Sequence, residues 1–136
     1  MIKRIMQRKW ENGDCSVACI AMVTGKSYEQ VERMFNKKGY IADDGTYFTF
    51  HKDMIEVLRE FGLVGKRKIF ISWKNTACPS IVKINLTKDN FWHWVVYTER
   101  NGKKVILDPN PKAPDEISDF RGRKGNGQYI VVSIKC

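Results

Sequence analysis

Three residues carry side chains that could together cleave an amide bond: Cys15, His93 and Asp108. A thiolate is a strong nucleophile, an imidazole accepts and returns a proton, and a carboxylate holds the imidazole in the orientation this chemistry needs. Cys15 follows Asp14 and begins the apolar run "CSVACIAMVTG", which is typical of a buried helix. Asp14 suits the N-cap position. We therefore expect Cys15 to be the first helical residue, where unpaired backbone N–H groups and the helix dipole favour its thiolate form.

The pair Asn101-Gly102 predicts how His93 and Asp108 meet. Asn-Gly is the preferred pair for a two-residue type I′ turn, which would place Arg100 opposite Lys103 and so determine the register of both strands. Because side chains alternate along a strand, His93 and Asp108 then share a face as diagonal neighbours, about 7–8 Å apart from backbone to backbone. Each residue also has a purely structural interpretation, as a packed core histidine and as a strand-ending Asp-Pro turn.

The elements that position these residues differ between the two halves of the chain. Apolar residues at helical spacing and capping signals predict helices over 14–25, 27–39 and 52–62. Runs of β-branched and aromatic residues, bounded by Pro, Asn, Asp or Gly, predict strands over 67–73, 80–86, 91–99, 103–108 and 128–134. Helices followed by an antiparallel meander belong to the α+β class.

We expect a single domain over residues 1–136, with a helical half at about 1–64 and a β half at about 65–136. The segment 109–127, before the last strand, is rich in Pro, Gly and charge. For this segment two interpretations stay open: it is mobile, or it lies over a cleft.

Composition limits the cofactors and partners. Hydrophobic residues make up 43% of the chain without any apolar run long enough for a signal peptide or a membrane span, so we expect a cytoplasmic protein that does not enter a membrane. The four cysteines and two histidines lack the spacing of a zinc site, and we expect no metal and no other cofactor. A net charge of +9 attracts polyanions, but no nucleic-acid motif accompanies it. A peptide or protein is therefore the favoured partner over nucleic acid, and the oligomeric state is left open.

The stretch "DCSVACIAMVTG" resembles the nucleophile helix of the papain-like peptidases that remove double-glycine leader peptides from bacteriocins. "HWVVY" and the later "VILDPN" are similar to the histidine strand and the Asp-Pro strand end of that family. The resemblance implies the papain-like cysteine peptidase fold, with N-terminal helices packed on a C-terminal antiparallel sheet. In that family the domain is usually fused to a membrane transporter and an ATPase, whereas here we expect a stand-alone domain. It also implies a thiol protease acting on a peptide or protein, with Cys15 as nucleophile, His93 as general base and acid, and Asp108 as the orienting carboxylate.

The oxyanion donor is where the sequence departs from that family. There a glutamine, whose amide helps form the oxyanion hole, precedes the cysteine by six positions, whereas Gln7 precedes Cys15 by eight. The resemblance implies Gln7 as the donor, with an insertion around "ENG", and Asn12 is the alternative. A second hypothesis is a catalytically silent papain-like scaffold whose basic surface serves as a binding module for an acidic protein or nucleic acid.

We interpret three further residues as structural. Cys19 lies one turn after Cys15 and is expected to be a buried packing residue. His51 is expected to be an ordinary surface or capping residue near the start of the third helix. Trp92 and Trp94 are expected in the core rather than in a substrate site, because alternation places them on the face opposite His93.

No role is predicted for the remaining two cysteines. Cys78 precedes a proline and Cys136 is the last residue, and neither lies in a pattern that indicates chemistry.

Overall fold

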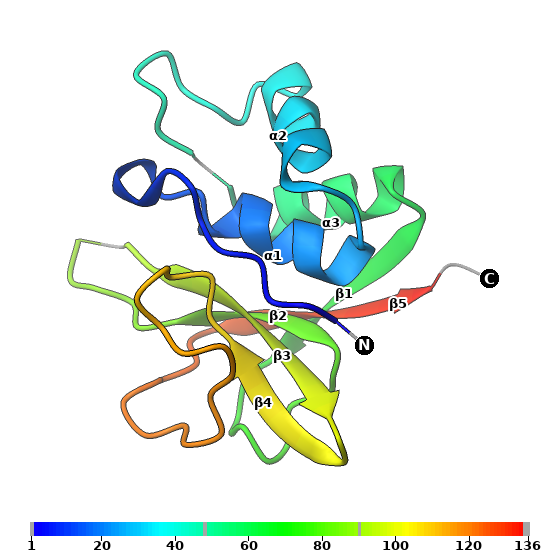
Figure 1. Ribbon diagram of the computed structural model, residues 1–136, viewed down its shortest axis with the longest axis vertical. Coiled ribbons are helices and arrows are strands. Elements are labelled where there is room, and N and C mark those ends of the chain that lie inside the picture. Colours follow the sequence, from blue (N-terminus) through cyan, green and yellow to red (C-terminus); the bar gives the residue numbers. More distant parts are fainter. Residues whose placement is uncertain (1, 48, 90, 135–136) are drawn as a thin grey trace.

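Three helices lie on one side of a five-stranded antiparallel sheet in the computed structural model, which describes residues 2–47, 49–89 and 91–134 (Figure 1). The helices are α1 (Cys15–Thr24), α2 (Tyr28–Lys37) and α3 (His51–Glu60), and a 3-10 turn, Trp10–Asn12, precedes α1. All three predicted helices and the α+β class are confirmed.

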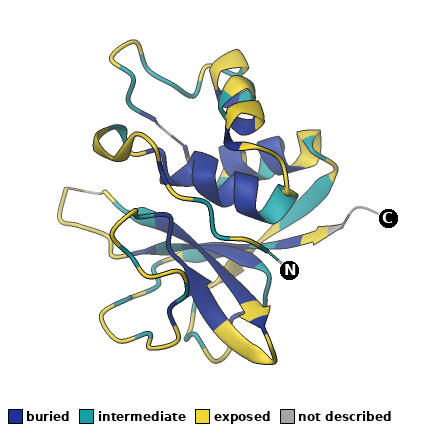
Figure 2. Ribbon diagram, viewed as in Figure 1, coloured by how far each residue is buried: buried dark blue, intermediate teal, exposed yellow. Residues whose placement is uncertain are grey.

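The helix α1 is the most buried element of the helical layer. Its first eight residues, Cys15 to Met22, are all buried (Figure 2), which matches the apolar pattern of its sequence. The next helix, α2, begins with the predicted capping box, in which the backbone N–H of Gln30 donates to Ser27 Oγ and that of Ser27 donates to Gln30 Oε1. Only one face of α2 is buried, so α1 is the central helix and α2 covers it.

The sheet contains β1 (Leu63–Ile69), β2 (Ser80–Ile84), β3 (His93–Arg100), β4 (Lys103–Leu107) and β5 (Gln128–Ile134), in the order β1-β5-β2-β3-β4. The expected meander is therefore wrong, because the last strand lies between the first two. Local turn signals identify neighbours joined by short hairpins, whereas the position of β5 depends on its pairing with both β1 and β2.

The first strand also begins earlier than expected. Leu63 starts β1 directly after Gly62, whose φ of 84° ends the preceding helix. Beyond Ile69 the chain leaves the sheet, and the Phe70 and Trp73 rings pack against each other with their centroids 5.0 Å apart. The aromatic run at 67–73 is therefore divided between an exposed edge strand and a core on the other side of the sheet.

The β3–β4 hairpin has the predicted register. Arg100 pairs with Lys103 and Val96 with Leu107, and both turn residues of Asn101-Gly102 have positive φ, as a type I′ turn requires. The ladder ends at Leu107, so Asp108 lies just past the end of β4, beside the beginning of β3.

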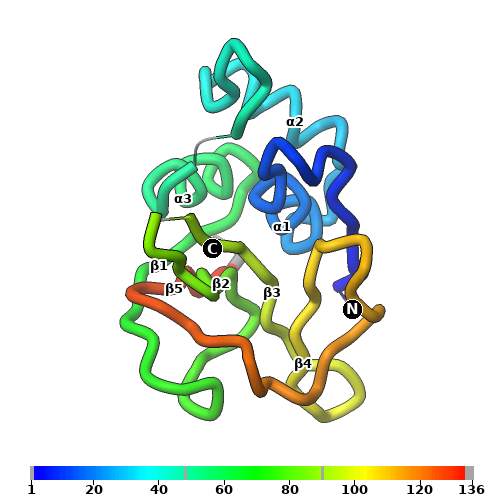
Figure 3. The backbone as a smooth tube through the Cα atoms, turned by 90° about the vertical axis from the view of Figure 1, so that its left-hand side faces the viewer, coloured from blue at the N-terminus to red at the C-terminus, as the bar shows by residue number. Residues whose placement is uncertain are grey.

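The two faces of the sheet are covered differently. Helices cover the face that carries Trp94, Val96 and Leu107. The segment 109–127, orange in Figures 1 and 3, runs beside the edge strand β4, where Ile117 pairs with Ile106 through backbone hydrogen bonds. Its Ala113, Ile117 and Phe120 pack in the apolar cluster on the opposite face. This segment therefore covers the second face of the sheet. Within the described part of the chain, no helix has the length and apolar character needed to cross a membrane.

Candidate active site

Asp14 occupies the N-cap position of α1, but its carboxylate does not cap the helix. It accepts hydrogen bonds from the Gln7 amide (3.0 Å), from the backbone N–H groups of Arg8 (2.9 Å) and Lys9 (3.1 Å), and from the Tyr28 hydroxyl (2.6 Å). The residue is fully buried. Four donors satisfy this buried charge, so the expected side-chain cap is wrong, although the helix begins where predicted.

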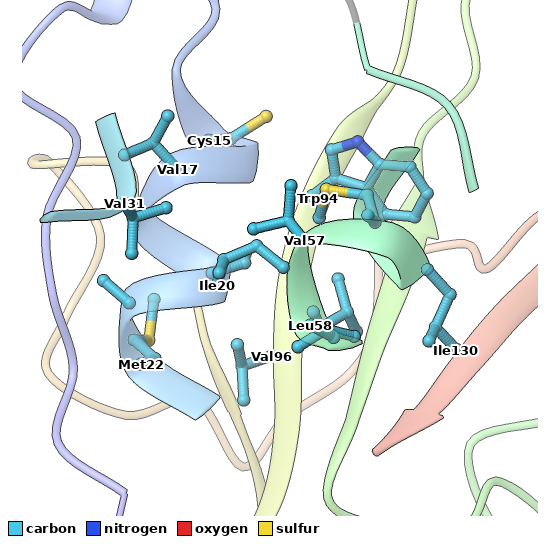
Figure 4. Packing of buried hydrophobic residues seen from close by; sticks show 14 of the residues in the cluster. Cys15, Val17, Ile20, Met22, Val31, Val57, Leu58, Trp94, Val96 and Ile130 are labelled. Atoms are coloured by element: carbon cyan, nitrogen blue, oxygen red, sulfur yellow. The ribbon is translucent and has the colours of Figure 1, made fainter. Parts of the chain in front are cut away.

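Cys15 is the first residue of α1, as expected, and only 6% of it is exposed. Figure 4 shows its sulfur projecting from the end of the helix, on the side of Trp94. Gly13, with a φ of 74°, turns the chain into the helix, and its carbonyl lies 4.0 Å from the sulfur. The thiol therefore lies beside the free N–H groups of the first turn, at the positive end of the helix dipole.

His93 and Asp108 are in direct contact, as the hairpin register predicts. His93 Nε2 lies 2.6 Å from Asp108 Oδ1, which also accepts the backbone N–H of Asn110 at 2.9 Å. Because a carboxylate only accepts, Nε2 is the donor. This bond leaves the other ring nitrogen, Nδ1, free.

The contacts of His93 also change its charge state. Burial disfavours the imidazolium, but the interactions with Asp108 and with Cys15 outweigh it and raise the pKa of His93 to about 9. Burial likewise opposes ionisation of Asp108, yet the hydrogen bond and charge of His93 hold the pKa of that carboxyl below its usual value. At neutral pH the pair is an imidazolium bound to a carboxylate.

An N-terminal strap, residues 4–9, joins the end of β4 to the beginning of α1. Its Arg4 guanidinium donates to the carbonyls of Asp108 (2.7 Å) and Asn110 (2.6 Å), and the Gln7 backbone N–H donates to Pro109 O at 2.8 Å. The Gln7 side chain then reaches Asp14. No pattern in the sequence indicated the role of Arg4, since both of its acceptors are backbone carbonyls about a hundred positions away.

Gln7 and Asn12 both line the cleft that contains Cys15. A 3-10 turn, Trp10–Asn12, lies between Gln7 and Cys15. The Asn12 amide lies against Gly45: a Cβ added to this glycine would be only 2.9 Å from Asn12 Nδ2. The Gln7 amide is thus held by Asp14, the residue before Cys15, whereas the Asn12 amide lies near Gly45.

The cleft has a volume of 710 Å³ and is lined by parts of three segments, 7–15, 46–50 and 85–94. Trp92 and Trp94 belong to this lining together with Cys15 and His93. Trp94 is also a core residue, as expected, with 2% exposed, but the argument that both tryptophans face away from the site is wrong. His93 begins β3, so the site lies around the end of the sheet rather than on one of its faces. The segment 109–127 does not contribute to the lining.

His51 is half-buried rather than an ordinary surface residue. It is the first residue of α3, and its Nε2 donates to the carbonyl of Gln128 at 2.6 Å while its ring packs edge-on against Trp94 at 5.1 Å. Burial lowers the pKa of this imidazole. His51 therefore joins α3 to β5 as a neutral side chain.

Among the cysteines, Cys19 is fully buried as expected, and burial raises the pKa of its thiol well above the usual value. Cys78 is half-buried, and Cys136 lies outside the described residues. Within the described ranges, His, Cys, Asp and Glu side chains form no group of three or more that could hold a metal ion.

Comparison with solved structures identifies the fold. One similar structure is a double glycine motif protease from an AMS/PCAT transporter in complex with the leader peptide, with a TM-score of 0.68, 23% identity, and coverage of 99% of this chain and 93% of that one. The fold is that of the double-glycine peptidase domains. Another is the peptidase domain of Streptococcus ComA, a bi-functional ABC transporter involved in a quorum sensing pathway. It has a TM-score of 0.70, 19% identity, and coverage of 99% of this chain and 100% of that one.

The double-glycine peptidase fold thus spans nearly the whole chain, and the expected papain-like α+β architecture is confirmed. Neither the family models nor the curated proteins that were searched give a match to this sequence. At these identities the likeness establishes the architecture, and the chemistry of the site must be argued from its own residues.

Proposed function

We propose that this protein is a cysteine peptidase that cleaves an amide bond in a peptide or protein substrate. The observation that carries the proposal is the 2.6 Å contact between His93 Nε2 and Asp108 Oδ1, with His93 lining the same cleft as Cys15 at the start of α1. In this proposal Cys15 is the nucleophile, His93 the general acid and base, and Asp108 the carboxylate that orients the imidazole.

The first half of the proposed reaction forms an acyl-enzyme. The Cys15 thiolate attacks the substrate carbonyl carbon, and the carbonyl oxygen takes up the negative charge. The Gln7 amide and backbone N–H groups of the first turn of α1 are the proposed donors to that oxygen. His93 then passes its Nδ1 proton to the leaving amine as the carbon–nitrogen bond breaks, which leaves the acyl group on the sulfur.

The second half restores the enzyme. Neutral His93 takes a proton from water while the water oxygen attacks the thioester carbonyl. The carbon–sulfur bond breaks, the acid product leaves, and Cys15 and His93 return to the ion pair. Throughout both steps the hydrogen bond to Asp108 keeps Nδ1 directed at the reacting atoms.

A peptide substrate is supported by the fold and by the cleft. One structure with this fold contains a leader peptide, and the cleft of 710 Å³ beside Cys15 has the size of a ligand site. We therefore place the substrate peptide in this cleft.

The proposal is tested by peptide cleavage and by thiol alkylation, both read by mass spectrometry. The purified protein is incubated with a mixed peptide library, with Cys15→Ala as the inactive variant and Cys78→Ala as the matched control. We expect cleavage by the wild type and by Cys78→Ala but none by Cys15→Ala, and we expect iodoacetamide to modify Cys15 first below pH 7. Cleavage that persists in Cys15→Ala would exclude Cys15 as the nucleophile.

A further inference from the structure

Exposed aromatic rings are concentrated at this cleft. Within the described residues, the large aromatic side chains that are exposed are Trp10 (51%), Phe50 (53%) and Phe91 (68%), and all three line the cleft. The other large exposed hydrophobic side chains are aliphatic. A gathering of exposed rings at one concave site is typical of a surface that binds an apolar group.

These rings continue from the rim to the proposed catalytic histidine. Phe50 lies 6.0 Å from Trp92 between ring centroids, and Trp92 lies 6.2 Å from the buried Trp94. Trp10, in the 3-10 turn before α1, packs edge-on against His93 at 5.9 Å between ring centroids. A large apolar side chain in the cleft would therefore contact aromatic surface.

The charge of the cleft is opposite to that of the molecule. Although the chain carries a net charge of +9, no lysine or arginine is among the described residues that line the cleft. Apart from His93, the charged residues of this lining are Glu11, in the 3-10 turn, and Asp89, between β2 and β3. Neither carboxylate has a hydrogen bond or an ion pair with another described residue, so both are available to a ligand cation.

The cations nearest in sequence do not neutralise these two carboxylates. Lys9 pairs with Glu32 at 2.9 Å, and Lys83 lies over the Trp92 ring at 4.9 Å, outside the set of lining residues. The exposed Lys88 precedes Asp89 but also does not line the cleft. The cleft therefore combines an aromatic surface with a local excess of negative charge.

A buried acceptor without a partner also lies in this lining. Gln7 is 5% exposed, and its Oε1 makes no hydrogen bond within the described residues while its Nε2 is held by Asp14. A buried carbonyl oxygen without a donor is costly.

We propose that the substrate segment in this cleft carries a large apolar side chain, such as phenylalanine, flanked on both sides by lysine or arginine. The proposal rests on the peptidase function proposed above and names its substrate class. The rings take the apolar side chain, Glu11 and Asp89 take the flanking cations, and the basic outer surface contributes nothing to this recognition.

Binding to the Cys15→Ala variant tests this without requiring turnover. Three acetylated and amidated peptides of equal length are compared by fluorescence anisotropy: phenylalanine between two lysines, phenylalanine between two glutamates, and alanine between two lysines. We expect the first peptide to bind about tenfold more tightly than the second, since two exposed charge pairs are each worth a few fold. Loss of the phenylalanine should cost about tenfold or more, because a buried Phe side chain contributes roughly 1.5–3 kcal/mol.

Charge variants assign the preference to the cleft. In the double variant Glu11→Gln/Asp89→Asn, the affinities of the lysine and glutamate peptides should differ by no more than about twofold. Glu99→Gln is the matched control, because this exposed carboxylate lies near the far end of β3 from His93. Its replacement should leave the difference in affinity between the two peptides unchanged.

The outcomes separate this inference from the proposed function. Equal binding of the lysine and glutamate peptides, tighter binding of the glutamate peptide, or no binding of any peptide would overturn the substrate class. A charge preference in binding together with wild-type protein that cleaves none of the bound peptides would support the cleft assignment and count against the peptidase.

Discussion

At the scale of single residues, the proposed site depends on buried polar groups that hold one another. Asp108 orients His93, and Asp14 orients the Gln7 amide while lying next to Cys15 in the sequence. Both carboxylates are at most 8% exposed. Hydrogen bonds to buried charges are stronger than those between neutral groups, so these contacts preorganise the site before substrate arrives.

Replacing His93 should change the reactivity of Cys15. In His93→Ala the thiolate loses its cationic neighbour, so alkylation by iodoacetamide should require a higher pH, and its rate at pH 7 should fall by about tenfold or more. The measurement is the rate of Cys15 modification against pH, read by mass spectrometry. His51→Gln is the control, because this imidazole is bonded to the Gln128 carbonyl. An unchanged profile in His93→Ala would rule out the proposed ion pair.

At the scale of elements, the N-terminal strap connects the segment that carries the proposed orienting carboxylate, Asp108, to the helix that carries the proposed nucleophile, Cys15. Arg4 and Gln7 bind the backbone just after β4, and Asp14 binds the strap just before α1. The end of the sheet and the start of the helix are thereby held at a fixed separation by a segment with no regular structure of its own.

Removing the Arg4 side chain should loosen this connection. Arg4→Ala leaves two carbonyls without their charged donor and should lower the free energy of unfolding by about 1–3 kcal/mol. Lys3→Ala is the control, because it removes the same charge from the exposed residue before Arg4. It should change the free energy of unfolding by less than about 0.5 kcal/mol. Urea denaturation of both variants gives the two values, and equal values would mean that the strap does not stabilise the fold.

At the scale of the whole molecule, the His93–Asp108 pair links stability to pH. The folded state raises the pKa of His93 from 6.5 to about 9, so between these values it holds a proton that the unfolded chain releases. This contribution is complete below about pH 6.5 and is lost as the pH rises through 9. The pKa of Asp108 is lowered, so its contribution is present above its usual value of 3.8 and is lost as the pH falls.

Denaturation of wild type and His93→Gln at several pH values tests this linkage. The wild-type free energy of unfolding should exceed that of the variant most at pH 6, and the difference should shrink towards pH 9. This difference in the free energy of unfolding should change by at most about 1.4 kcal/mol per pH unit, which is the value for one proton. Parallel curves for the two proteins would show that His93 has the same pKa in both states.

Net charge is the other whole-molecule property. The +9 surface is the basis of the alternative hypothesis, a binding module for an acidic protein or nucleic acid. That hypothesis stays a prediction, and it concerns the outer surface rather than the cleft.

The sequence by itself determined the helices, the β3–β4 register and the contact between His93 and Asp108. These features depend on local signals: helical periodicity, a capping box and an Asn-Gly turn whose geometry sets every pair that follows it. Cys15 at the start of α1 follows from the same kind of signal. Such features involve residues that are near in sequence or joined by one tight turn.

Only the tertiary structure decided the position of β5, the role of the strap and the composition of the cleft. Arg4 meets Asp108, and Trp10 meets His93, across large separations in sequence. The Asp14 carboxylate was expected to cap its helix, yet it is taken by donors from the strap and α2. The physical reason is the same in each case. The contacts of a buried polar group or an exposed ring come from residues that are distant in sequence, and only the folding of the chain brings those residues together.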